Sequence, residues 1–270
     1  MTITDSGLDA LAPVDGLLVD LTEGVLSITI DRPDSLNSVN PKVFAAMADT
    51  LERAATDARV RVVRIGGTGR GFCSGAAIGA EDTGDGHEPM ETLHEGNRAI
   101  RAIVNMPRPV VAVVQGPTAG IGVSVALACD LVLVSEKAFF LLAFTKIGLM
   151  PDGGASALVA AAIGRIRAMK MALLAERVSA ADALEWGMVS AVYSADTLEA
   201  EADKVIKRLM SGPAVAYAKT KKAINGATLD TLDTTLAHET AGQHKLLQAP
   251  DLAEGIQAFQ EKRSPNFTDV

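Results

Sequence analysis

The chain is short of the residue types that hold metals and disulfides. Its 270 residues include two cysteines, Cys73 and Cys129, and four histidines. The cysteines lie far apart in apolar surroundings and form no CxxC pair, so we expect two reduced, buried thiols. His238 and His244 do not have the spacing of two ligands one helical turn apart. The sequence therefore predicts no metal site.

Positive charge and long apolar runs are also scarce. Lys and Arg number 25 against 33 Asp and Glu, and the formal net charge is -8. A protein that neutralises nucleic-acid phosphates needs a cationic surplus instead. No apolar stretch approaches the roughly 18 residues that cross a bilayer, and the N-terminus lacks the pattern of a signal peptide. We expect a cytoplasmic protein that binds no nucleic acid and has no membrane span.

The order of strand-like and helix-like stretches predicts an α/β fold. Alternating and buried apolar patterns predict strands at residues 17–21, 25–30, 60–65, 110–114 and 131–134. Amphipathic patterns predict helices at about 41–57 and 88–105. From about residue 154 the pattern becomes helical, apart from one short strand at 189–193, and helices are expected to start at 213, 230 and 251. We expect a flexible tail at 1–13, a core at 14–210 and a helical region at 211–270.

Two glycine-rich loops, residues 66–75 and 116–122, follow buried strands. Such a loop leaves backbone N–H groups unpaired, and a following helix adds the positive end of its dipole, so the loop suits an anion. Neither loop carries a dinucleotide fingerprint or a P-loop motif. N–H groups from both loops could instead converge on one carbonyl oxygen as an oxyanion hole. Ordinary structural turns are the alternative interpretation.

Five ordered segments carry a resemblance to a known family. They are residues 30–38 (IDRPDSLNS), 71–78 (GFCSGAAI), 114–124 (VQGPTAGIGVS), 147–154 (IGLMPDGG) and 259–267 (FQEKRSPNF). Together they resemble the crotonase superfamily, the enoyl-CoA hydratase/isomerase family. The resemblance implies a spiral of ββα units and a C-terminal helical region for trimerisation and active-site cover. It also implies a homotrimer or a hexamer (dimer of trimers), and an acyl-CoA thioester substrate, whose coenzyme A enters as part of the substrate, with no tightly bound cofactor.

The resemblance also implies that the backbone N–H groups of Ala76 and Ile121 hold the thioester carbonyl. Enolate formation or water addition places negative charge on this oxygen, and one preorganised donor is typically worth roughly 3–4 kcal/mol. Gly75 precedes the first donor, and Gly120 and Gly122 flank the second. These glycines are expected to let the backbone approach the substrate closely.

Two positions depart from the hydratases of the superfamily. Where those enzymes carry two glutamates around a water, this chain has Ser124 and Phe144, which we expect to line the substrate site. The Met-Pro-Asp-Gly-Gly turn resembles the acidic turn of the family's isomerases, so Asp152 is the predicted general acid/base. An ordinary turn aspartate is the alternative interpretation. The favoured reaction is Δ3-Δ2 double-bond isomerisation of enoyl-CoA in fatty acid metabolism.

Contacts to coenzyme A are predicted at Arg32, Phe259 and Lys262, which resemble CoA-binding positions of the family. Cationic side chains suit the phosphates of this ligand. Solvated surface positions are the alternative interpretation, because long cationic side chains are mostly exposed.

Three other functions are open on the sequence. An enoyl-CoA hydratase could use Asp152 with a loop carboxylate from Glu81, Asp82 or Asp85. A serine hydrolase could use residues 122–126 (GVSVA), although Ala126 replaces the second glycine of the nucleophile elbow. The fold could also bind acyl-CoA without turnover.

Overall fold

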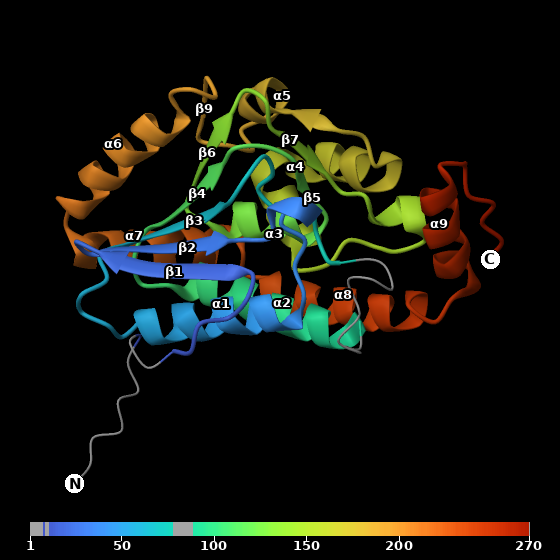
Figure 1. The fold of residues 1–270 in the computed structure, drawn as a ribbon, viewed down its shortest axis with the longest axis horizontal. Helices are drawn as coiled ribbons and strands as arrows, with labels where there is room; N and C mark the ends of the chain where they lie inside the picture. The colour runs from blue at the N-terminus through green and yellow to red at the C-terminus, as the bar shows by residue number, and fades with distance from the viewer. Residues whose placement is uncertain (1–7, 9–10, 78–88, 270) are drawn as a thin grey trace, which may run out of the picture.

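The computed structural model describes residues 8, 11–77 and 89–269, and in this part of the chain a six-stranded sheet forms the centre of the fold (Figure 1). The strand order is β1-β2-β3-β4-β6-β9. Their bounds are β1 Leu17–Thr22, β2 Val25–Ile30, β3 Val62–Gly67, β4 Val110–Val114, β6 Leu131–Ser135 and β9 Ala191–Tyr193. β1 pairs antiparallel with β2, and every later neighbour in this sheet is parallel. The carboxyl ends of the parallel strands therefore share one edge.

The β1–β2 hairpin is closed by Glu23 and Gly24, which lie between the paired residues Thr22 and Val25. Both have left-handed backbone angles, with φ of 51° at Glu23 and 88° at Gly24. Positive φ at both central positions matches the right-handed twist of the strands. This turn joins the two strands that the sequence predicts at residues 17–21 and 25–30.

Two helices cover one face of the sheet, α1 (Pro41–Ala54) and α2 (Pro89–Asn105). The Asn40 side chain caps α1 by accepting from the Val43 N–H at 3.0 Å, with Pro41 in the first helical position. The buried faces of α1 and α2 join β2, β3 and β4 in the main hydrophobic core. α1 ends before the predicted residue 57.

The opposite face of the sheet is covered by α6 (Leu198–Met210), as Figure 1 shows. Leu198, Ala202 and Ile206 of this helix pack on Val62 and Leu133 in a second, smaller apolar cluster. Burial on both faces explains why the central strands are continuous apolar runs rather than alternating ones.

A second, smaller sheet has three short strands. Its strands are β5 Thr118–Ala119, β7 Phe139–Leu141 and β8 Val178–Ser179. The expectation of one short strand after residue 154 is wrong, because β8 precedes β9. A strand of two residues is too short to show an alternating pattern. α3 (Ile121–Ala128), the 3-10 turn η3 (Phe144–Ile147) and α4 (Ala155–Leu174) lie between these strands in the sequence, and α5 (Ala180–Glu185) follows β8.

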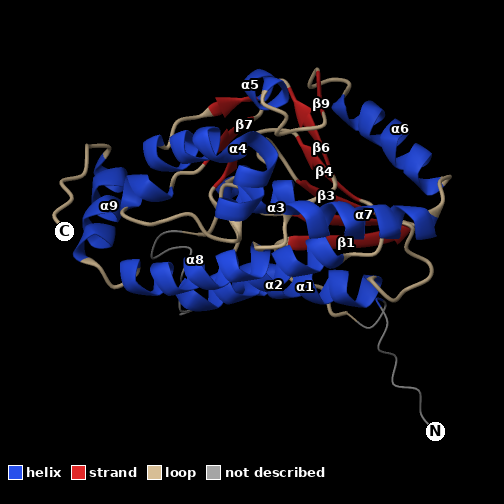
Figure 2. Cartoon of the chain, turned by 180° about the vertical axis from the view of Figure 1, so that it is seen from behind, coloured by secondary structure: helices blue, strands red, loops and turns tan. Residues whose placement is uncertain are grey.

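Three helices follow, α7 (Ala214–Thr228), α8 (Leu232–Leu246) and α9 (Pro250–Glu261), and each starts within two residues of its predicted position. Figure 2 shows α8 running beside α2, and the Asn97 amide joins them by donating to the Thr240 hydroxyl at 3.0 Å. Along the described ranges, no helix is both long and apolar enough to cross a membrane. The predicted tail at 1–13 falls largely outside the described residues.

Candidate functional site

The two glycine loops meet beyond the carboxyl ends of β3 and β4. The Ala119 N–H donates to the Cys73 carbonyl at 2.8 Å, which pairs the loops like short strands. Gly75 and Gly120 both have positive φ, 102° and 54°. A Cβ atom at Gly75 would lie only 3.2 Å from the Ala119 carbonyl oxygen. Glycine is required where the loops approach each other this closely.

Both predicted oxyanion donors lie at this junction. Ile121 is the first residue of α3, so its N–H belongs to the open amino end of the helix. Ala76 follows Gly75 and is exposed. Among acceptors in the described part of the chain, neither the Ala76 N–H nor the Ile121 N–H has a hydrogen-bond partner. The α3 dipole adds partial positive charge at the same place.

The Asp152 turn packs against the first turn of α3. The Ser124 hydroxyl donates to the main-chain carbonyl of Asp152 at 3.0 Å. A Cβ atom at Gly153 would lie 2.6 Å from the Ile121 side chain, and one at Gly120 would lie 3.8 Å from the Phe144 ring. The fold therefore brings Asp152, Ser124 and Phe144 to the two glycine loops.

The Asp152 carboxyl group has two unlike oxygens. Oδ2 accepts from the Gln243 amide at 2.9 Å, whereas Oδ1 is buried without a hydrogen-bond partner among the described residues. Burial raises the pKa of Asp152 to about 7, opposed by the Gln243 hydrogen bond and supported by the negative charge of Glu239. A carboxyl group that is half ionised near neutral pH suits proton transfer in both directions.

Sequence interpretation missed Gln243 and Glu239, which both come from α8. The Glu239 carboxylate accepts from the Gly154 N–H at 2.6 Å and the Ser156 N–H at 2.9 Å. Burial raises the pKa of Glu239, and these hydrogen bonds oppose the shift. The sequence did hold a signal: Leu232, Leu236, Glu239 and Gln243 follow helical spacing, which places two polar residues on the buried face of α8.

Comparison with known proteins identifies the family of the chain. The family model for enoyl-CoA hydratase/isomerase matches residues 20–270. The chain belongs to this family. The predicted crotonase superfamily and its α/β fold are confirmed, and the chain is a crotonase-type enzyme with the family's acyl-CoA hydratase/isomerase function.

The relatives include both hydratases and isomerases by name. The chain is 37% identical to 1,2-epoxyphenylacetyl-CoA isomerase of Escherichia coli, covering 93% of this chain and 98% of that protein. It is 30% identical to trans-2-decenoyl-[acyl-carrier-protein] isomerase of Streptococcus mutans, covering 93% and 97%. The crystal structure of an enoyl-CoA hydratase from Mycobacterium avium subsp. paratuberculosis matches with a TM-score of 0.89 and 64% identity, covering 95% of this chain and 100% of that one.

The predicted CoA contacts come from two parts of the chain, the segment after β2 and the end of α9. Arg32 follows β2 at the loop edge of the sheet, where its Nη1 donates to the Ser38 carbonyl at 3.1 Å. Phe259 on α9 is 73% exposed. Lys262 is the cap residue that follows α9, and it is exposed. The CoA-binding role of these three residues stays a prediction.

The serine hydrolase alternative does not fit the crotonase fold found here. Ser124 is fully buried inside α3, and its hydroxyl donates to a backbone carbonyl. The described histidines, His94, His238 and His244, have exposed side chains on α2 and α8. The loop carboxylates Glu81, Asp82 and Asp85 lie outside the described residues.

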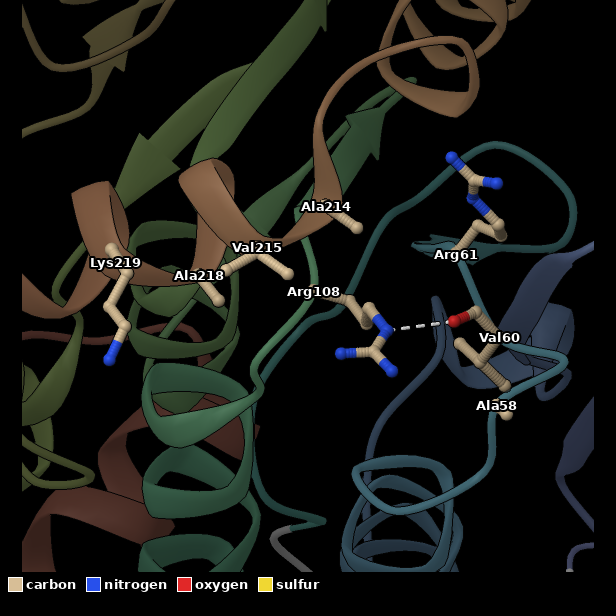
Figure 3. A pocket seen from close by; sticks show the side chains of 8 residues that line it. All are labelled: Ala58, Val60, Arg61, Arg108, Ala214, Val215, Ala218 and Lys219. Carbon is tan, nitrogen blue, oxygen red and sulfur yellow. Dashed lines mark hydrogen bonds between the residues drawn. The ribbon is translucent and has the colours of Figure 1, made fainter.

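The pocket in Figure 3, of about 370 Å³, lies away from this site. Its walls come from the amino ends of β3 and β4 and from the start of α7, whereas ligands of parallel sheets bind at the carboxyl ends. The Arg108 Nε donates to the Val60 carbonyl at 2.9 Å, and Arg61 donates to the Met210 carbonyl at 2.8 Å. These arginines join chain segments at the base of the sheet.

The sequence also predicts two buried thiols and no metal site. Cys73 and Cys129 are free and buried, as predicted. Burial raises the pKa of Cys73 to about 12 and also raises the pKa of Cys129. Within the described ranges, no group of His, Cys, Asp and Glu side chains is arranged to hold a metal ion.

Proposed function

We propose that the enzyme moves the double bond of an enoyl-CoA from the Δ3 to the Δ2 position, with Asp152 as its single general acid/base. The observation that supports this most is the Asp152 carboxyl group beside the two loops, with a buried, unpartnered Oδ1. Glu239 is the neighbouring carboxylate, but both of its oxygens accept from backbone N–H groups. One free carboxyl oxygen suffices for a proton shuttle, whereas the family's hydratases place two glutamates around a water.

The reaction balances with one proton. The Asp152 carboxylate takes a proton from C2 of the 3-enoyl thioester, and the electron pair moves onto the thioester oxygen to give a dienolate. The Ala76 and Ile121 N–H groups stabilise this oxyanion. Asp152 then returns the proton to C4, which leaves the double bond between C2 and C3 and restores the carboxylate. Phe144 and Ser124 occupy the two positions where a water-activating pair would stand.

The test is incubation of the purified enzyme with a 3-enoyl-CoA and, separately, with a 2-enoyl-CoA. We expect the ultraviolet band of the conjugated thioester to appear from the 3-enoyl substrate without a change in mass. Asp152→Asn is expected to lower the rate by about 10² to 10⁴-fold, the usual contribution of general acid–base catalysis. Asp196→Asn, which changes an exposed aspartate, is the matched control and should leave the rate unchanged.

Other products would contradict isomerisation. A gain of one water from the 2-enoyl substrate would make the enzyme a hydratase with a different acid/base arrangement. Tight binding of both thioesters without any product would make it a non-catalytic acyl-CoA-binding protein.

The proposed assembly is a homotrimer or a dimer of trimers. It is supported by an apolar stripe on the second half of α4, where Ile166, Met169 and Leu173 are 75%, 43% and 62% exposed. These residues share one helical face. The exposed Phe259 on α9 would also be covered by a neighbouring subunit.

A further inference from the structure

The Gln243 amide lies between two groups that accept hydrogen bonds. Its Nε2 donates to the Met150 main-chain carbonyl at 2.9 Å and to Oδ2 of Asp152 at 2.9 Å. The Gln243 side chain is 2% exposed, and its Oε1 is buried without a partner among the described residues. Leaving a buried oxygen unpartnered costs free energy, so the two bonds from Nε2 must outweigh that cost.

The Met150 carbonyl fixes the orientation of this amide. A main-chain carbonyl can only accept a hydrogen bond, so the NH₂ group of Gln243 must face it. A flipped amide would place Oε1 against the Met150 carbonyl and the Asp152 carboxylate, both of which carry negative charge. Gln243 therefore remains a donor to Oδ2 whether or not Asp152 has bound a proton.

We propose that Gln243 is a positioning residue that confines the shuttled proton to Oδ1 of Asp152. An oxygen that already accepts from a fixed N–H is the less favourable site for a proton, and Oδ1 has no competing partner. This inference rests on the proposed isomerase function. In each turnover, Oδ1 forms the O–H bond when the C2–H bond breaks, and the same O–H bond breaks when the C4–H bond forms.

The charged groups around Asp152 affect its pKa differently from the Gln243 hydrogen bond, so the two effects can be told apart. Glu239, one helical turn before Gln243 on α8, is the charged neighbour in the described structure that raises the pKa of Asp152. His244 and Lys245 on α8 point outward and are exposed. From α3, the group that contacts the Asp152 turn is the neutral Ser124 hydroxyl. Gln243 lowers the pKa of Asp152 through its hydrogen bond.

The experiment replaces Gln243 with methionine, which has a similar shape but no N–H donor. The Asp152 carboxyl is titrated by ¹³C NMR on protein labelled at aspartate, with Asp152→Asn to assign the signal. Since a hydrogen bond to a charged group corresponds to roughly one pH unit or more, we expect the titration in Gln243→Met to move upward by about one unit. The acidic limb of kcat/KM for a 3-enoyl-CoA should move by the same amount. With that shift the rate at pH 7 falls about fivefold and recovers by pH 9.

The control is Gln248→Met, which changes an exposed glutamine two residues beyond the end of α8. It should change neither the Asp152 titration nor the acidic limb of kcat/KM. Gln243→Leu is the second variant if methionine prevents folding. It also removes the N–H donor without adding a titrating group, so it should raise the Asp152 titration as well.

Two results would overturn the inference. One is an Asp152 titration that does not move in a folded Gln243 variant. The other is an equal loss of rate at every pH with the acidic limb in place, because that loss would mean that Gln243 only supports the structure. Failure of the proposed function has a different signature: the wild-type Asp152 would titrate near 7 and respond to Gln243, yet 3-enoyl-CoA would remain unconverted.

Discussion

At the residue scale, the raised pKa of Asp152 lowers the stability of the folded state. The pKa is about 7 in the folded chain against 3.8 for the free side chain, so the folded state binds more protons between these values. The free energy of unfolding therefore falls as pH rises from about 4 through 7. We expect Asp152→Asn to increase it by up to about 4 kcal/mol at pH 8 and to change it little at pH 4.

This prediction is measured by denaturant unfolding at both pH values, with Asp196→Asn as the exposed control. A variant that is less stable than the wild type at pH 8 would show that Asp152 holds the turn together instead. A gain in stability combined with a loss of activity is expected of a desolvated catalytic group.

The sequence was enough to predict Asp152 as the acid/base, but it did not indicate the groups that contact its carboxyl. Asp152 lies in a short motif with a characteristic place in the family. Gln243 and Glu239 are 91 and 85 residues away from the groups that they contact, and no local pattern encodes such a pair. The available signal was two polar residues on the apolar face of a predicted helix. This signal does not say which residues of the chain they contact.

At the scale of elements, Glu239 serves as the amino-terminal cap of α4. Gly154, the cap residue of that helix, has no side chain to accept from the first N–H groups. Glu239 accepts from the Gly154 and Ser156 N–H groups across the helix pair. A carboxylate at this end also interacts favourably with the helix dipole.

We expect Glu239→Gln to lower the free energy of unfolding by about 1–2 kcal/mol, because an amide can accept only through one oxygen. Loss of the negative charge should also lower the pKa of Asp152, opposite to the effect of Gln243→Met. Chemical unfolding and the ¹³C titration of Asp152 measure the two effects. An unchanged stability would contradict the capping role, and an upward titration shift would contradict the charge effect.

Long, strongly patterned elements could be predicted and short ones could not. The strand at 110–114 was predicted with its observed bounds, because five buried apolar residues between prolines and a glycine loop leave little choice. β5 and β8 have two residues each, and they pair because the surrounding loops bring them together. Their existence depends on tertiary contacts rather than on local propensity.

At the scale of the whole molecule, the apolar stripe of α4 predicts self-association. A lysine at Ile166 or Leu173 would place a charge in the proposed subunit contact, so we expect Ile166→Lys with Leu173→Lys to shift the assembly toward monomers. Leu18→Lys, at a leucine 52% exposed on β1, is the control. Sedimentation velocity measures the distribution, and a double variant with the wild-type mass would contradict this use of the stripe.

One face of α8 supplies the cap of α4, the charge near Asp152 and the donor to its Oδ2, while the two glycine loops lie in the first half of the chain. The loops that we propose to bind the thioester oxygen and the residues that set the basicity of the carboxyl group are thus encoded in separate stretches. Substitutions on α8 can alter proton chemistry without disturbing thioester recognition. Descendants of this enzyme could in this way diverge in the reaction they catalyse while still accepting the same class of substrate.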